Sequence, residues 1–510
     1  MIQAFNFPRN LSIDAAIKRF KVDFKLKKEF AWSGNRCFYD SFDWRLYNRS
    51  MLLYSEQDKM CLKSINSLKI QDSMTIQKIP KFTADLPSGT FRDRLSSILE
   101  MRALIKLNCL HIDHIKYRIL DKNDKTNLYL VMENNRLKVG PKSYHSFAAC
   151  ILLPIKGYEN SVIQMSQWLQ TNGFTQFKKN ILEKVLEYHT RHPNDYSSKI
   201  DIKLSANMTA SEAAKSILVS LFNTMKKNQH GIIEDIDSEF LHDYRVAIRR
   251  IRSVFGQLKN IFEKDIYIRA KKDFKYLIRL TNRKRDLDVY GLKEEKYKMM
   301  LPTDMQMYIK PFFVKTNKEE RIQHNKIANY LVSDEYNILV NYWEKFFNSS
   351  LTTQQGGLKS EKNVLLLAKN IIYNRYKRVI KLGDSITKSS SNSLLHKLRI
   401  ECKKLRYLLE FFSSLFAQND IDYLIKQLKK LQDNLGEYND LTIQQNTLRD
   451  FIEVRSNKNT LLAVGVLIGK LHDIQLSVKK SFAGSYKYFA SRKIKNKFYQ
   501  MFAAPTGMKS

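Results

Sequence analysis

The stretch Leu241-His-Asp-Tyr-Arg-Val-Ala-Ile-Arg-Arg-Ile-Arg252 recurs 154 residues later as Leu395-His-Lys-Leu-Arg-Ile-Glu-Cys-Lys-Lys-Leu-Arg406. The same offset continues without a gap as far as Asp286, which pairs with Asp440. A constant offset over such a length is typical of an internal repeat. We therefore expect two copies of one helical unit, packed about a pseudo-twofold axis.

Apolar residues follow a helical period in both copies. They stand at positions 241, 244, 248, 251, 255, 258 and 262 of the first copy, and at 395, 398, 405, 409 and 412 of the second. Steps of three and four place such residues on one face of a helix. Each copy is therefore predicted to contain a helix with one core-facing stripe.

A row of cations runs one position over from each apolar stripe. The rows are His242, Arg245, Arg249 and Arg252, and then His396, Arg399, Lys403 and Arg406. Like charges at this spacing cost roughly a few tenths of a kcal/mol per pair on an exposed helix, yet no acid stands in either row. A basic stripe is usually a solvated helix face. Its recurrence in register instead favours a polyanion lying between the copies and supplying the counter-charge.

The charge of the whole chain supports an anionic partner. The formal net charge is +36, of which +13 falls in residues 1–200 and +23 in the remainder. Both parts are basic, so the charge is not confined to a tail. Nucleic acid, a membrane surface and other polyanions are the partner classes that such a charge indicates.

Two residue types in the repeat invite other interpretations. His242 and His396 lack neighbouring Cys or His at ligand spacing, and their arginine neighbours would repel a cation, so we expect no bound metal and no cofactor. The acids Asp286, Asp288 and Asp440 are expected to cap helices or to orient arginines rather than to act in catalysis.

The periodicity predicts an α+β multidomain chain. Residues 1–192 read as mixed α and β, with strand-like runs at 36–40, 127–132 and 147–153 and a helix at 159–172. A linker is expected at 192–198, and the chain beyond it is helical. We expect one domain at 1–192 and another at 205–505, the latter with repeats at about 205–345 and 360–505.

The cysteines and the distribution of apolar residues indicate the cellular compartment of the protein. The five cysteines are scattered, form no CxxC, and are odd in number, which argues against a disulfide framework and favours a reducing interior. Residues 1–30 show no secretory signal, and no continuous run of ~18 apolar residues predicts a membrane span. We expect a cytoplasmic protein.

The repeat resembles the conserved histidine α-helical domain, or CHAD domain, over roughly residues 205–505. That family is similar in having two H-x-x-R-x-x-x-R/K-R/K-x-R helices, each followed by an Asp-containing helix junction; here Gly436 would end one helix and Asp440 cap the next. The resemblance implies two pseudo-symmetric helical bundles around a basic groove or pore that binds inorganic polyphosphate, and an association with polyphosphate granules. It implies the following binding set: His242, Arg245, Arg249, Arg250, Arg252, Lys272, Lys275, Arg285, His396, Arg399, Lys403, Lys404, Arg406, Lys426 and Lys429.

The segment Phe38-Tyr-Asp-Ser-Phe-Asp-Trp-Arg-Leu-Tyr47 resembles part of the CYTH, or triphosphate tunnel, fold, an antiparallel β architecture. Enzymes of that fold hold metal and triphosphate with an E-x-E-x-K strand and further acids. Neither Asp23-Phe-Lys-Leu-Lys27 nor the late run 148–153 supplies such acids. Residues 1–192 are therefore interpreted as a degenerate CYTH-like domain.

Three functions remain open from the sequence. The favoured one is binding of inorganic polyphosphate without catalysis, because Arg, Lys and His suit phosphate better than bases. A metal-dependent inorganic triphosphatase acting through residues 1–192 is the first alternative, although the carboxylates that such chemistry needs are not found. Nucleic-acid binding is the second, although it usually adds exposed aromatic or base-reading side chains.

Overall fold

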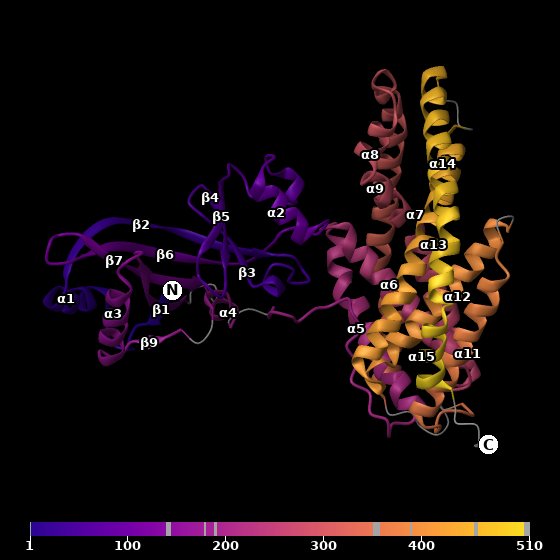
Figure 1. Ribbon diagram of the computed structural model, residues 1–510, viewed down its shortest axis with the longest axis horizontal. Coiled ribbons are helices and arrows are strands. Elements are labelled where there is room, and N and C mark those ends of the chain that lie inside the picture. Colours follow the sequence, from indigo (N-terminus) through magenta and orange to yellow (C-terminus); the bar gives the residue numbers. More distant parts are fainter. Residues whose placement is uncertain are drawn as a thin grey trace. The chain divides into compact units, whose positions relative to one another are not determined.

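The computed structural model describes residues 2–138, 144–177, 180–187, 191–349, 357–387, 390–452 and 457–503. The chain divides into two compact units, Met1–Ser197 and Ser198–Ser510. The first is built around an antiparallel sheet and the second is helical (Figure 1). The expected α+β multidomain architecture is confirmed.

The first unit is one nine-stranded sheet with the order β5-β4-β3-β2-β6-β7-β8-β1-β9. The strands are β1 Gln3–Asn6, β2 Lys25–Asp40, β3 Met51–Glu56, β4 Lys59–Ser64, β5 Ile70–Thr75, β6 Ile105–Leu120, β7 Thr126–Lys138, β8 Tyr144–Pro154 and β9 Thr175–Gln176. All neighbours pair antiparallel. The three predicted strand-like runs lie in β2, β7 and β8, and the antiparallel sheet fits a tunnel-like fold.

Helices pack on both faces of the sheet. They are α1 Ile13–Asp23, α2 Thr90–Leu99, α3 Glu159–Thr171 and α4 Ile181–Leu186, with short 3-10 turns η1 Tyr47–Arg49 and η2 Thr83–Asp85. Phe38 of β2 shares a core with α4, and its neighbour Tyr39 on the other face shares another with α2. Phe20 of α1 and Met165 of α3 share a buried core with Leu130 and Leu152 of the sheet. The predicted helix at 159–172 is confirmed, and it ends before Gly173, whose φ of +82° favours glycine.

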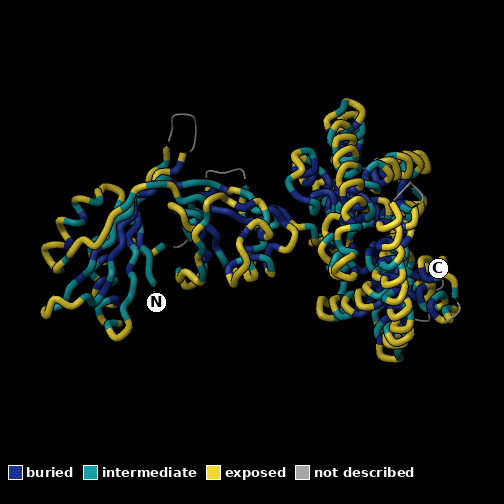
Figure 2. The backbone as a smooth tube through the Cα atoms, turned by 90° about the horizontal axis from the view of Figure 1, so that it is seen from above, coloured by how far each residue is buried: buried dark blue, intermediate teal, exposed yellow. Residues whose placement is uncertain are grey.

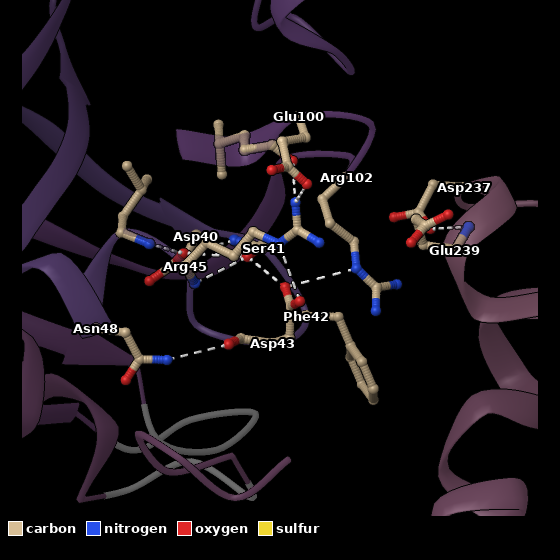
Figure 3. Close-up of polar contacts among 12 residues, drawn as sticks. Asp40, Ser41, Phe42, Asp43, Arg45, Asn48, Glu100, Arg102, Asp237 and Glu239 are labelled. Carbon is tan, nitrogen blue, oxygen red and sulfur yellow. Dashed lines mark hydrogen bonds and ion pairs between the residues drawn. The ribbon is translucent and has the colours of Figure 1, made fainter. Parts of the chain in front are cut away.

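The turn after β2 is organised by a buried carboxylate (Figure 3). Asp40 accepts hydrogen bonds from the backbone N–H groups of Leu46 and Tyr47, both at 2.9 Å. Burial raises the pKa of Asp40 to about 7, against the lowering effect of those bonds. Asp43 nearby is paired with Arg45 at 3.0 Å. Residues 38–47, which resemble a strand and turn of the tunnel fold, do form the end of a strand followed by a hydrogen-bonded turn.

One cysteine pair departs from the sequence expectation. Cys37 of β2 lies opposite Cys109 of β6 in the strand register, and the two form a disulfide. The sequence argued against a disulfide framework, because the cysteines are odd in number and form no CxxC. The two cysteines of this pair are 72 residues apart. Only the register of a long strand pair brings them together. Cys61, Cys150 and Cys402 are free and buried.

The second unit repeats its helices at the predicted offset (Figure 1). Its helices are α5 Ala210–Ile233, α6 Ser238–Gln257, α7 Lys264–Gly291, α8 Glu294–Met300, α9 Lys310–Leu331, α10 Asp334–Asn348, α11 Val364–Asp384, α12 Asn392–Phe411, α13 Gln418–Ile452, α14 Lys458–Phe489 and α15 Arg492–Phe502, with 3-10 turns η3 Thr303–Ile309 and η4 Ser413–Leu415. The starts of α5 and α11, α6 and α12, and α7 and α13 are each 154 residues apart. The N-caps Thr209 and Asn363 keep the same offset and pair as a β-bridge.

The predicted apolar stripes form the core of this unit. All seven apolar positions named in α6 and its continuation, from Leu241 to Phe262, are buried, and so are the five in and after α12, from Leu395 to Phe412. Figure 2 shows the buried backbone on the inner sides of the helices and the exposed backbone outside. The helical period therefore locates the core-facing side of both helices.

The predicted helix junctions were wrong. α13 runs without a break through Gly436 and Asp440, and α7 runs through Asp286 and Asp288, so none of these acids caps a helix. Leu435 and Leu441 are buried on either side of the glycine, which keeps α13 in one piece. A Cβ at position 436 would meet only open space, so the glycine marks no close approach.

By length and composition, α14 could cross a membrane, although no uninterrupted apolar run led us to expect a span. A third of its most apolar window is buried within the protein (33%). Its buried residues, among them Val464, Leu467 and Leu471, recur at helical spacing. That pattern is typical of a helix with one stripe packed in a core.

Candidate polyanion-binding site

A cavity of about 460 Å³ lies among α8, α12, α13 and α14. Five cations line it: Lys293, Lys296, Arg399, Lys403 and Arg406. Three acids of α13 also line it: Asp433, Glu437 and Asp440. The cations outnumber the acids, so the cavity favours an anion.

The α12 cations reach the cavity because of how α12 packs. Leu398, Cys402 and Leu405 are completely buried and anchor one face of the helix. Arg399 and Lys403 follow those residues by one position, so they project from the adjoining face. The predicted cationic row of the second copy therefore lines a cavity from Arg399 onward.

Arg249 of α6 brings a charge of the first repeat to the same place. Its charge acts on both Arg399 and Lys403, lowering the pKa of each. Burial is the largest cause of the lowered pKa of Lys403, which falls to about 7, and Arg399, Arg249 and Arg406 lower it further. The two cationic rows therefore meet where Arg249 of the first row lies near Arg399, Lys403 and Arg406 of the second.

Two arginines here have unused hydrogen-bonding capacity. The Nε atoms of Arg249 and Arg399 are buried and have no hydrogen-bond partner within the described part of the chain, whereas Arg406 Nε lies 3.2 Å from Glu410 Oε1. Gln432 also lines the cavity, and its amide oxygen and nitrogen are buried without a hydrogen-bond partner among the described residues. Buried donors are normally satisfied, and phosphate oxygens are strong acceptors for arginine.

Two of the three acids lie near arginines, which is the second of the two roles expected for them, whereas Asp288 pairs with Lys284 at 2.7 Å. Asp440 lies 3.7 Å from Arg399. Asp286, the residue 154 positions earlier, attracts Arg245 in the first repeat. Burial raises the pKa of Asp286, and the nearby charge of Asp440 adds to the effect. The Arg–Asp pairing is therefore repeated, although neither acid caps a helix.

Three residues of the predicted binding set are occupied by internal contacts. Arg245 donates to Ile278 O at 3.2 Å, Thr281 Oγ1 at 2.7 Å and Asn282 Oδ1 at 2.9 Å, and burial and Arg249 lower its pKa to about 10. Arg250 of α6 pairs with Glu410 of α12 at 2.9 Å. Arg285 donates to Ser238 O at 3.1 Å. These cations join helices to one another.

The rest of the predicted set is dispersed. Lys404 pairs with Glu401 at 2.8 Å, and His396 Nδ1 lies 2.9 Å from Asn439 Oδ1. His242 is half-buried on α6, and Arg252 is exposed. Lys426 and Lys429 are exposed on α13 outside the cavity lining. Lys272 and Lys275 line a different groove on α7.

Two lining cations escaped the sequence argument. Lys293 and Lys296 lie at the start of α8, and the residues 154 positions later are Thr447 and Asp450. The repeat therefore does not identify these lysines as site residues. Because Glu294 and Glu295 stand between them, they do not form a run of like charges either. Only the packing of α8 beside α12 to α14 brings them to the cavity.

The first unit has a separate interior site with a different charge balance. Arg36 is paired with Glu56 at 2.8 Å and with Glu133 at 3.0 Å. His114 Nδ1 also lies 3.0 Å from Glu133. Burial alone would lower the pKa of Arg36, but the two glutamates raise it. A cavity of about 420 Å³ is lined by Arg36, Lys63, Glu133 and Glu183. Glu133 is paired with Arg36, and Glu183 accepts a hydrogen bond from the hydroxyl of Tyr47.

Comparison with known proteins assigns the helical unit. The sequence profile of the CHAD domain matches residues 216–449. Those residues are a CHAD domain. A crystal structure of the CHAD domain from the plant Ricinus communis is 21% identical, with a TM-score of 0.48, and the match covers 57% of this chain and 95% of that chain. PptA from Streptomyces chartreusis is 10% identical, with a TM-score of 0.44, and the match covers 55% and 100%. No curated protein matches this chain.

Proposed function

We propose that the CHAD domain of this protein binds inorganic polyphosphate in the cavity among α8, α12, α13 and α14. The observation that carries the proposal is the convergence of Arg249, Arg399, Lys403 and Arg406. Arg249 and Arg399 each keep a buried Nε without a partner within the described residues. Lys293 and Lys296 extend this cationic surface. A phosphate polymer would supply both the counter-charge and the missing acceptors.

The lining favours a phosphate polymer over nucleic acid. Tyr297 is the only aromatic residue among the described residues that line the cavity. It is fully buried, and its hydroxyl donates to Gln444 Oε1 at 2.8 Å. Single-stranded nucleic acids are usually held by bases stacked on exposed aromatic rings. The cavity offers charge and donors but no such surface.

We propose in addition that this binding places the protein on intracellular polyphosphate granules, and that residues 205–505 are sufficient for it. The cationic residues of the cavity all fall within that range. None of its lining residues falls in the described part of residues 1–192. Granule association would then depend on the same cations as binding in solution, so Lys296→Ala should reduce both.

The proposal is tested by binding of labelled long-chain polyphosphate across a salt series, with duplex DNA as competitor. Affinity should fall steeply as salt rises, because binding releases condensed counterions. Arg399→Ala and Lys296→Ala should each weaken binding, whereas Lys21→Ala, an exposed lysine on α1, should not. Preference for DNA at every salt concentration would contradict the proposal.

A further inference from the structure

A second groove lies on the first repeat, away from the cavity described above. It has a volume of about 620 Å³ and is lined by residues of α7, the end of α9 and the first half of α10. It shares no lining residue with the cavity of α12. Lys272 and Lys275, which the family resemblance assigned to polyphosphate, line this groove. Its ligand is therefore a separate question.

The groove has an exposed apolar floor. Ile268, Tyr276 and Ile338 line it with 51%, 43% and 67% of their surfaces exposed. Tyr276 packs edge-on against Tyr330, which belongs to the same lining. Exposed apolar groups gathered in a concave surface indicate a binding site for another molecule. Bare polyphosphate has no apolar surface with which to cover them.

Cations surround that floor. Lys271, Lys272, Lys275 and Arg279 line the groove and are exposed. They take part in none of the ion pairs found between described residues, whereas Arg269 is near Asp273 at 3.6 Å. Glu335 and Asp273 are the acids of the lining. The cations outnumber the acids, so the lining of the groove favours a negatively charged partner.

We infer that this groove docks an amphipathic helix of a partner protein, with leucine-like residues on one face and acidic residues beside them. Apolar anchors would cover Ile268, Tyr276 and Ile338, and carboxylates would pair with the lysines. From Ile268 to Arg279 the groove follows α7 for about 17 Å at ~1.5 Å per residue, the length of three helical turns. Helix-in-groove recognition uses anchors at this spacing.

The inference is tested on the full chain with a synthetic probe. The probe is a fluorescein-labelled peptide of Leu and Glu with leucines at every third and fourth position. A control peptide has the same composition with its leucines spread around the helix. The double variant Ile268→Ser/Ile338→Ser removes apolar contact, and Lys272→Ala/Lys275→Ala removes charge. Val314→Ser and Lys480→Ala are the matched controls, because both residues are exposed outside the groove.

We expect the patterned peptide to bind, the control peptide to bind at least about tenfold more weakly, and each double variant to lose about tenfold in affinity, which is about 1.4 kcal/mol. Equal binding of the two peptides, or an unchanged affinity of Ile268→Ser/Ile338→Ser, would show a simple anion site and overturn the inference. The inference would also be overturned if polyphosphate or DNA displaced the peptide completely and this displacement were lost in Lys272→Ala/Lys275→Ala. Polyphosphate binding by Arg399→Ala tests the other cavity independently.

Discussion

The guanidinium of Arg399 lies 3.7 Å from the carboxylate of Asp440, and Arg245 and Asp286, each 154 residues earlier, attract one another in the same way. The two copies use this shared pair differently. Arg245 donates hydrogen bonds to residues of α7. Arg399 instead lines a cavity and keeps a buried Nε without a partner among the described residues. In the first repeat this cation joins two helices, and in the second it lines the cavity in which we propose that polyphosphate binds.

The first prediction follows from that divergence. Arg245→Ala should lower the free energy of unfolding by about 1–3 kcal/mol, because it leaves the buried acceptors of Ile278 and Thr281 without their donor. Arg252→Ala, at an exposed position of the same row, should change stability by less than about 0.5 kcal/mol. Urea denaturation of both variants provides the measurement. Equal stability of the two would contradict the structural role of Arg245.

A second prediction concerns the meeting of the two rows. Arg249→Ala and Arg399→Ala should each weaken polyphosphate binding, and the double variant should lose less than the sum of the two effects, because the residues share a ligand. Titration of labelled polyphosphate into the four proteins of this cycle gives the coupling. Strict additivity would mean that the repeats bind separately. Lys21→Ala serves as the unaffected control.

The third prediction is a pH dependence of binding. The pKa of Lys403 is lowered to about 7 by burial and by three arginines, and a bound polyanion would raise it again. Binding therefore takes up a proton, so affinity should fall as the pH rises from about 6 to 8. Asp440 is the acid that opposes this lowering. Lys403→Met should bind more weakly at pH 6 and show a flatter profile; an unchanged slope would refute the assignment.

The same lysine affects stability in the opposite direction. Its pKa is lower in the folded protein than the ordinary value of 10.5, so the unfolded chain binds more protons between about pH 7 and 10. Its contribution to the free energy of unfolding therefore rises with pH across that window. Comparing the pH dependence of unfolding for the wild-type protein and Lys403→Met isolates this contribution. A wild-type curve no steeper than that of the variant would contradict it.

The sequence predicted those parts of this protein that the repeat and the helical period control. The presence of a helix at α6 and at α12, and the burial of residues such as Ile248 and Leu405, follow from spacing alone. The continuity of α13 through Gly436 did not, because a glycine is a local signal and the packing of Leu435 and Leu441 overrides it.

The candidate site was only partly predictable. Arg399 and Lys403 were identified because their row recurs. Lys293 and Lys296 have no counterpart in the other repeat, so only the tertiary packing of α8 reveals them. Sequence spacing also could not distinguish Arg245, whose partners lie on a helix more than thirty positions along the chain.

A further prediction uses two glycines within helices. A Cβ at Gly231 would lie 2.1 Å from the ring of Phe240, so Gly231→Ala should cost about 1–3 kcal/mol of stability through overpacking. A Cβ at Gly484 of α14 would meet open space, and Gly484→Ala should stabilise the protein by up to about 1 kcal/mol through helix propensity. Thermal unfolding should shift in opposite directions for the two variants. A destabilised Gly484→Ala would mean that α14 packs differently.

The last prediction concerns catalysis by the first unit. Hydrolysis of a triphosphate in a tunnel-like fold needs carboxylates that are free to hold Mg²⁺ or Mn²⁺, because lysine and arginine have no acceptor atoms for a metal. Glu56 and Glu133 are instead bound to Arg36, which takes both oxygens of Glu133 at 3.0 and 3.2 Å. The attraction of Arg36 outweighs burial and holds the pKa of Glu133 well below its usual range. Giving these carboxylates to a metal would cost the protein that buried pairing.

We therefore expect the purified protein to release no phosphate from tripolyphosphate or ATP with either metal. The measurement is phosphate release over time, with a chelator as the blank. Metal-dependent release well above that blank, lost in both Glu56→Gln and Glu133→Gln while thermal unfolding shows each variant to be folded, would establish a triphosphatase. Two variants are needed because Glu133 is buried and its replacement strands Arg36, whereas Glu56 is partly exposed and its replacement leaves Arg36 paired with Glu133.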